Sequence, residues 1–221
     1  MTTMKIRNIV YPSVFIPFLA WAQPADFGTW FCVAAKKKIN KQFSLSLTEQ
    51  FRFDENSTRL NVLYSDLGLS CKLNNYIKVT TAYRNIYKSV EYQVFSYRHR
   101  IYGDFDFRYS ISKLELKFRT RVEREIKQTI LSEKDLLPEN LNRNKLTASY
   151  RINKIEPFVS YELFIPFSNL GAELEKERYS VGAGYKISKN ISCNVFYLLQ
   201  RSLMPKFNRW HVLGADLVFE F

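Results

Sequence analysis

Arginine and carboxylate side chains occupy alternate positions in several segments of the chain, and this spacing indicates ion-pair chemistry. Arg119, Arg121 and Glu123, for example, share one parity. Residues two apart lie on one face of a β-strand, and the planar fork of Arg fits a carboxylate through two hydrogen bonds. We expect a lattice of such pairs on the polar face of the strands that carry them, formed by Arg52, Asp66, Arg84, Arg100, Asp104, Asp106, Arg108, Glu115, Arg119, Arg121, Glu123, Arg151, Glu162 and Arg178, with Glu125 and Asp216 on the same face.

Nucleophilic catalysis would need a serine or cysteine beside a base, and the chain has 2 histidines. Neither His99 nor His211 stands in a His-x-Ser arrangement, because residues 101 and 213 are Ile and Leu. Ser96 and Ser202 lie near them in the sequence, so a spatial dyad is the minor alternative. We favour histidines at a membrane interface and predict no catalytic residue.

Metal ligation is not predicted, because the candidate ligands are scattered. Cys32, Cys71 and Cys193 are an odd number of cysteines far apart in the sequence, and they form no disulfide framework. Together with two distant histidines they lack the spacing of a metal centre. The acidic segment 54–57 lacks the glycine and the later glutamate of a calcium loop, so we predict a turn there. We expect no metal and no cofactor.

A period of two runs through the chain from residue 42 onward and predicts the β-strands that must position these groups. Phe43, Leu45 and Leu47, for example, alternate with Ser44 and Ser46. Tight connections alternate with longer polar ones, which is typical of an up-and-down barrel. A soluble sandwich would have shorter strands and more glycines than the 7 found here. The predicted fold is an all-β, up-and-down antiparallel transmembrane β-barrel.

The number of strands is open at this point. Eleven segments qualify, the first at Thr29–Lys36 and the last at His211–Phe221. Bacterial single-chain barrels have even numbers of strands, so we expect about 10–12, with ten and twelve both open. The segment Gln23–Lys38 is the least well assigned, because the residues before Thr29 are too few to cross a membrane before a turn at 39–41. Longer connections are predicted at 88–97, 126–143, 166–176 and 201–209.

The composition excludes a disordered chain and a helical membrane protein. Hydrophobic residues make up 46% of the chain and aromatic residues 16%, which is too much for disorder. Beyond the first two dozen residues, no apolar run approaches the roughly 18 residues that a membrane helix needs. Aromatic residues at this frequency are typical of strands and of membrane-interface belts.

Residues 1–22 have the features of a secretory signal peptide. Lys5 and Arg7 precede a short apolar stretch, and Ala20-Trp21-Ala22 has the small-x-small pattern of a cleavage site. We therefore predict a single barrel domain over residues 23–221, which retains 31 basic and 21 acidic residues, a formal charge of +10. In an exported protein this excess favours anionic lipid or polysaccharide over nucleic acid as a partner.

The last strand ends in an assembly signal for the outer membrane. Leu217, Phe219 and the terminal Phe221 lie on one face of this strand. An amphipathic final strand that ends in phenylalanine resembles the signal read by the barrel assembly machinery. We predict that this machinery is a partner during biogenesis and that the protein resides in the bacterial cell outer membrane.

Several stretches of the chain, taken in order, resemble a family of bacterial outer-membrane proteins catalogued as domain of unknown function 2490. The stretches are Asp26–Trp30, Phe43–Leu47 with Phe51–Phe53, Asn56–Leu60, Tyr64–Gly68, His99–Asp104, Pro138–Asn140 with Arg143–Leu146, and Pro157–Phe164. The resemblance implies an outer-membrane β-barrel of unassigned activity and supplies no catalytic residues.

These observations lead to a non-enzymatic barrel with a structural or narrow-pore role. Paired charges would plug much of a lumen that is scarcely wider than its side chains. A surface enzyme similar to lipid A deacylases or phospholipases is the alternative. Expected partners are outer-membrane lipid and lipopolysaccharide. The basic cluster Lys36, Lys37, Lys38 and Lys41 at the first turn is interpreted as a solvated end, with contact to phospholipid headgroups as the alternative. The oligomeric state is open.

Overall fold

The computed structural model of the chain describes residues 26–91, 94–128, 138–167, 174–203 and 207–221. The predicted signal peptide at 1–22 lies outside the described residues. The eleven strands are β1 (Asp26–Lys38), β2 (Phe43–Asp54), β3 (Arg59–Lys72), β4 (Ile77–Glu91), β5 (Val94–Ile111), β6 (Leu114–Lys127), β7 (Glu139–Tyr150), β8 (Ile155–Pro166), β9 (Lys176–Lys186), β10 (Ile191–Ser202) and β11 (Asn208–Glu220). No helix among the described residues is long and apolar enough to cross a membrane.

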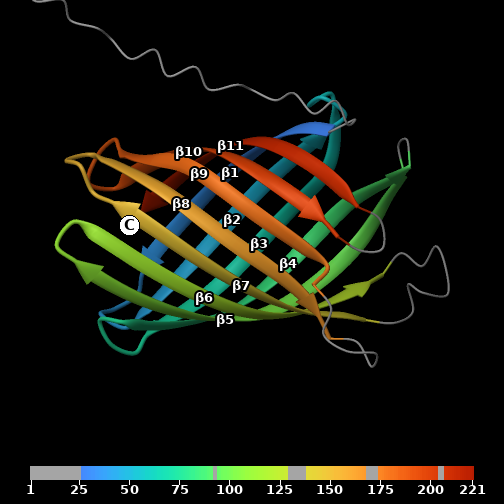
Figure 1. Cartoon of the computed structure of the whole chain (residues 1–221). Helices are drawn as coiled ribbons and strands as arrows, with labels where there is room; N and C mark the ends of the chain where they lie inside the picture. The colour runs from blue at the N-terminus through green and yellow to red at the C-terminus, as the bar shows by residue number, and fades with distance from the viewer. Residues whose placement is uncertain (1–25, 92–93, 129–137, 168–173, 204–206) are drawn as a thin grey trace, which may run out of the picture.

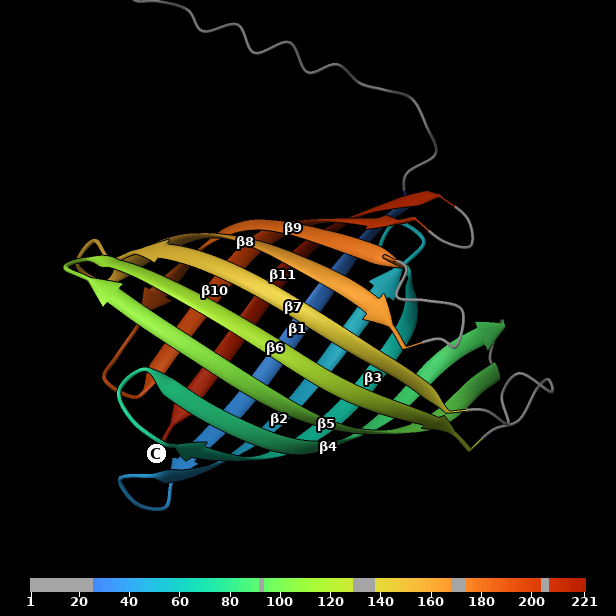
Figure 2. The ribbon, with the colours of Figure 1, turned by 60° about the horizontal axis from the view of Figure 1, so that its bottom comes forward.

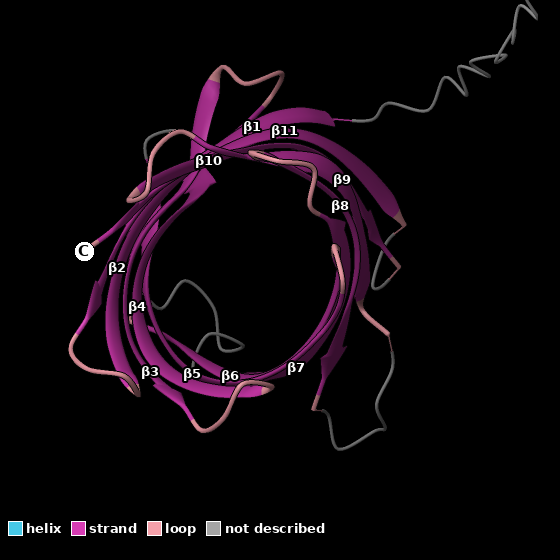
Figure 3. Ribbon diagram, turned by 90° about the vertical axis from the view of Figure 1, so that its left-hand side faces the viewer, coloured by secondary structure: helices cyan, strands magenta, loops and turns pink. Residues whose placement is uncertain are grey.

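The strands form one closed barrel in which each strand pairs antiparallel with its neighbour in the chain (Figures 1 and 2). The view along the axis shows the complete ring (Figure 3). Closure is made by β1 and β11, which pair in parallel from Asp26 opposite Trp210 to Lys36 opposite Glu220. The predicted barrel is therefore confirmed.

The barrel has eleven strands, within the expected 10–12, but the expectation of an even number was wrong, and the closing pair is parallel. Neighbouring strands run in opposite directions, so the first and the last of an odd number of strands run in the same direction. The seam between β1 and β11 must therefore be parallel. The strand β1 itself extends further at both ends than the predicted Thr29–Lys36. It needs no crossing strand before it, because it starts at the same end of the barrel as β11.

The two ends of the barrel differ in their connections (Figure 1). The short turns that follow β1, β3, β5, β7 and β9 lie at one end together with the C-terminus, and we call this the turn end. β1 starts, and β2, β4, β6, β8 and β10 end, at the opposite end, which we call the loop end. The long connection predicted at 88–97 is wrong, because β4 continues to Glu91 and β5 begins at Val94. Tyr87 and Tyr97 face each other across these strands with ring centroids 4.8 Å apart and help to hold them together.

Side chains of the turns determine where the strands stop at the turn end. The Oδ1 atom of Asn40 accepts hydrogen bonds from the backbone N–H groups of Gln42 and Phe43, both at 2.8 Å. Asn74 makes the equivalent pair to residues 76 and 77, also at 2.8 Å. Such Asx turns satisfy backbone donors that leave the ladder. Ser112 and Asn153 supply the positive φ angles, 56° and 55°, in two further turns. The acidic segment 54–57 is also a turn, as predicted.

The outward face of the barrel is apolar and the inward face is polar, as the alternation predicted. Val159, Val181 and Val195 point outward near the middle of three neighbouring strands, and each is more than half exposed. Ser160 and Glu162, on the other parity of β8, are buried. Large apolar side chains therefore cover the outside of the barrel, and polar side chains line its interior.

One sector of the interior is apolar instead. Trp30 on β1, Leu198 on β10 and Val212 on β11 form a buried cluster, and Phe196 and Trp210 pack against it. The ring of Phe196 also lies over Gly214, where a Cβ atom would meet the ring at 2.0 Å. Only glycine fits at that position, and the aromatic ring fills the space that it leaves.

The parallel seam can be tested with the native Cys32. Its Cα partner across the seam is Asp216, on the same inward parity. We predict that Asp216→Cys, in a chain carrying Cys71→Ser and Cys193→Ser, forms a disulfide with Cys32 on oxidation, since adjacent strands lie about 4.8 Å apart. The measurement is a reductant-sensitive change in gel mobility of the denatured chain. Leu217→Cys in the same background is the control, because residue 217 faces outward; equal cross-linking of both variants would contradict the register.

Candidate functional site

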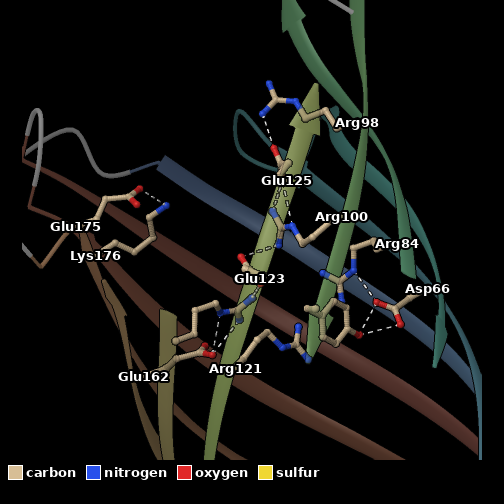
Figure 4. A network of polar contacts seen from close by, with 12 residues as sticks. Asp66, Arg84, Arg98, Arg100, Arg121, Glu123, Glu125, Glu162, Glu175 and Lys176 are labelled. Atoms are coloured by element: carbon tan, nitrogen blue, oxygen red, sulfur yellow. Dashed lines mark hydrogen bonds and ion pairs between the residues drawn. The ribbon is translucent and has the colours of Figure 1, made fainter. Parts of the chain in front are cut away.

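The interior of the barrel holds a lattice of ion pairs near the middle of strands β3 to β6 (Figure 4). Arg84 donates from Nε to Asp66 at 2.6 Å, and the hydroxyl of Tyr102 donates to the same carboxylate at 2.7 Å. Arg121 donates from Nε and Nη2 to both oxygens of Asp104, at 2.6 and 2.7 Å. All five residues are buried. The pair of Arg121 with Asp104 is the bidentate kind that the residue types suggested, whereas Arg84 is joined to Asp66 through Nε.

Three glutamates join further arginines into a continuous network (Figure 4). Glu125 accepts from Arg98 at 2.9 Å and also from Arg100. The links that extend the network around the barrel are Arg100 to Glu123 at 3.1 Å, Arg143 to Glu123 at 3.2 Å, Arg143 to Glu162 at 2.9 Å and Arg119 to Glu162 at 2.8 Å. The sequence analysis did not assign Arg98 and Arg143 to the lattice, although both share the inward parity of their strands.

Aromatic rings alternate with the arginines and were missed by the sequence analysis. The guanidinium of Arg84 lies 3.8 Å from the ring centroid of Tyr64, and that of Arg121 lies 3.7 Å from the ring of Tyr102. A cation over an aromatic face is stabilised, more so when both are shielded from water. The set of arginines and rings, which we call the interior hoop, is Trp30, Arg52, Tyr64, Arg84, Tyr102, Arg121, Arg143, Phe164 and Arg178, and it alternates except where Arg143 follows Arg121. The sequence could have predicted these inward rings, because they share the parity of the inward charged residues on their strands.

Some predicted lattice members lie at the turn end and outside the buried network. Arg108 pairs with Glu115 at 3.4 Å, but half of the Arg108 side chain is exposed. Arg151 follows the end of β7 and pairs with Glu156 at 3.4 Å with its side chain 66% exposed. Asp106 is buried and accepts from two lysines, Lys78 at 3.3 Å and Lys117 at 3.2 Å. The exposed pairs, Arg108 with Glu115 and Arg151 with Glu156, contribute little to stability.

Arg52 and Arg178 stand apart from the paired arginines. Among the described residues Arg52 has no carboxylate at ion-pair distance, and its Nε donates to Gln50 at 2.8 Å. The Nε of Arg178 likewise donates to Gln200 at 2.8 Å, and its closest carboxylate oxygen is on Glu162, at 3.8 Å. Both guanidiniums lie over the ring of Trp30, at 4.1 and 5.1 Å from its centroid.

Two cavities open around these residues on the loop side of the hoop. The first has a volume of about 380 Å³ and the second about 340 Å³. Both are lined by Arg52, Lys88, Lys176 and Arg178, which we call the cationic quartet. We refer to the two cavities together as the vestibule.

The serines and histidines considered for a nucleophilic dyad lie on opposite faces of the barrel wall. Ser96 is inward and buried, whereas His99 lies on the outward parity among Tyr83 and Tyr97. Ser202 shares the inward parity of Leu198, and His211 contacts Tyr197 on the outside. Ser96 therefore forms no dyad with His99, and Ser202 forms none with His211. No group of three or more His, Cys, Asp or Glu side chains within the described ranges could hold a metal ion.

The family model described as "Protein of unknown function (DUF2490)" matches residues 27–211. The chain belongs to this family. The resemblance that the sequence suggested is thereby confirmed over nearly all of the barrel. No curated protein matches the chain.

Two solved structures are similar to the chain in general form. One is described as outer-membrane expressed OmpT of Vibrio cholerae, with 10% identity, a TM-score of 0.41 and 72% of this chain covered. The chain spans about half of that neighbour, 54% of its length. The other is the translocator domain of the autotransporter NalP from Neisseria meningitidis, with 10% identity, a TM-score of 0.41, and 80% of this chain and 73% of that chain covered. Neither neighbour indicates what this chain does.

The pairing of Arg121 with Asp104 can be tested by deletion. Both side chains are less than a tenth exposed, so Arg121→Ala leaves a buried carboxylate unpaired and should lower the free energy of unfolding by about 3–5 kcal/mol. Urea titration of the barrel in lipid vesicles measures this. Adding Asp104→Ala should restore part of the loss, because the unpaired charge is then removed.

The control for this experiment is Arg151→Ala at the turn end, where we expect a change below about 1 kcal/mol. Lys145 is not a suitable control. It lies in the middle of β7, opposite Arg119 on one side and Glu162 on the other. Equal effects of the Arg121 and Arg151 substitutions would contradict the role of the buried lattice.

Proposed function

We propose that this protein is an outer-membrane β-barrel whose lumen is closed near mid-depth and whose role is structural rather than that of an open pore. The observation that carries the proposal is the burial of the interior hoop and its carboxylates. Tyr64, Arg84 and Tyr102 are each 7% exposed and Phe164 is 3% exposed, although all four point into the lumen. A water-filled channel at this level would expose the side chains that line it.

The outside of the barrel supports a place in a membrane. Leu67, Ile101, Val122 and Val159 each expose more than half of their surface. Apolar area of this extent around a whole barrel is unfavourable in water and favourable in lipid. Outward aromatic pairs near the strand ends, including Tyr87 with Tyr97 on the loop side and Tyr76 with Tyr109 at the turns, resemble the girdles of barrels at the membrane surface.

The outer membrane is the membrane we propose, with the C-terminal strand as its assembly signal. The outward parity of β11 carries Leu217, Phe219 and Phe221, and the side chain of Phe221 is exposed. The backbone of Phe221 closes the seam, since its N–H donates to Lys36 at 2.8 Å and its carbonyl accepts from Lys38 at 2.9 Å. Its side chain is therefore free for a partner such as the barrel assembly machinery.

The closed lumen predicts the outcome of single-channel recording. In a planar bilayer the protein should show no steady conductance, whereas Tyr64→Ala combined with Tyr102→Ala removes two rings of the hoop and should produce discrete openings. Tyr83→Ala combined with Tyr87→Ala on the outward face is the matched control and should stay closed. Regular conductance steps from the unmodified protein would overturn the proposal in favour of a narrow pore.

The assembly signal predicts different effects in cells and in purified protein. Phe221→Ala keeps the backbone bonds of the seam and removes an exposed ring, so the free energy of unfolding should change by less than about 0.5 kcal/mol. The amount of heat-modifiable barrel in the outer-membrane fraction of cells should fall. The control is Tyr150→Ala, another exposed ring on the outside. An unchanged amount of assembled Phe221→Ala protein would remove the support for this signal.

A further inference from the structure

The vestibule on the loop side of the hoop has more positive charge than its own carboxylates can neutralise. Nine Lys or Arg side chains and four Glu side chains line the larger cavity, a formal excess of five positive charges, and Arg84 and Arg143 among them pair with Asp66 and Glu162 outside the lining. The side chains that line the smaller cavity include the cationic quartet and two carboxylates, Asp26 and Asp54. Inside a low-dielectric wall, such an excess attracts anions strongly.

The excess is concentrated in the quartet. Among the described residues, neither Arg52 nor Lys88 has a carboxylate at ion-pair distance, and Lys88 is exposed within the vestibule. Arg178 is 3.8 Å from Glu162, a carboxylate that already pairs closely with Arg119 and Arg143. Lys176 pairs with Glu175 at 2.7 Å (Figure 4). Three of the four cations therefore have unused capacity for an anionic partner.

The two arginines of the quartet are held in place before any ligand binds. Gln50 and Gln200 accept from the Nε atoms of Arg52 and Arg178, both at 2.8 Å, and the ring of Trp30 lies against both guanidinium planes. In Arg52 this leaves the two Nη groups without a hydrogen-bond partner among the described residues. Guanidinium groups fixed in this way bind the oxygens of phosphate with little loss of side-chain entropy.

We propose that the vestibule is a binding site for a phosphate-bearing anion with two or more negative charges. Such a ligand supplies several oxygens to donors that converge from β2, β4 and β9, and a cavity of about 380 Å³ is within the size range of small-molecule sites. The phosphate is carried either by a soluble ion or by the headgroup of an anionic lipid. The proposal goes beyond the closed barrel and does not depend on whether the lumen conducts.

Tryptophan fluorescence provides a direct test. Trp30 contacts Arg52 and Arg178, and Trp210 lies against Trp30 and lines the smaller cavity. Inorganic pyrophosphate, titrated into barrel folded in a phosphate-free maltoside detergent, should produce a saturable change in fluorescence. A second titration uses phosphatidic acid in mixed micelles. Saturation with pyrophosphate identifies a soluble source, and saturation with phosphatidic acid alone identifies a lipid source; either supports the site.

Variants separate this site from general attraction to a basic protein. Lys88→Gln changes an exposed side chain that has no ion pair among the described residues, so the barrel should still fold, as heat-modifiable mobility would verify. Its affinity for the phosphate ligand should fall about tenfold, the factor for one charge-assisted hydrogen bond. Arg52→Gln should have at least the same effect.

The matched control is Arg151→Gln, which removes an equally positive side chain at the turn end and should leave the affinity unchanged. Absence of a saturable signal with both phosphate compounds would overturn the proposal. Equal weakening by Lys88→Gln and Arg151→Gln would also overturn it. Neither result would bear on the single-channel recording, so failure of this site and failure of the closed lumen are distinguishable.

Discussion

A barrel of eleven strands must fill its interior with the side chains of its own strands, and this constraint governs the arrangement seen here. Charged groups taken out of water are stable only when partners surround them. Asp66 illustrates the solution, because it receives both the guanidinium of Arg84 and the hydroxyl of Tyr102. The aromatic rings occupy the space between the cations and exclude water from the ion pairs. The closed lumen that we propose would follow from satisfying this buried charge.

The parallel seam follows from the same closed architecture. Antiparallel hairpins form between neighbours in the chain, but β1 and β11 meet only when the whole chain is in place. The last residue takes part directly, since the backbone of Phe221 bonds to Lys36 and Lys38. The end of the chain therefore both completes the barrel and presents an exposed aromatic ring at the turn end.

Charge is distributed unevenly along the axis of the barrel. Around mid-depth, Glu123, Glu125 and Glu162 are each shared by two or more arginines, so each of these arginines has a carboxylate at ion-pair distance. Towards the loop end the cations of the quartet outnumber their partners. Glu123 and Glu125 of the paired lattice also line the larger cavity of the vestibule, so the unpaired cations lie beside paired ones, as the proposed anion site requires.

The amino-acid sequence by itself determined the strands and which face of each strand is polar. A period of two puts Arg119, Arg121 and Glu123 on one side whatever the neighbouring strands are, because alternation is a property of the extended backbone. The same alternation identified the outward residues, and eleven strand segments were visible in it. Family membership was also recognisable from short motifs in order.

Only the tertiary structure decided which strands meet at the seam and which charges pair. Glu162 binds Arg119 from two strands away, 43 residues apart in the sequence, and no local pattern encodes that register. The inward rings of Tyr64 and Phe164 were hidden for a similar reason, since aromatic residues suit both faces of a barrel wall. Whether Arg52 has a carboxylate partner depends on the position of every neighbouring strand, so the unpaired cations of the vestibule became visible only in three dimensions.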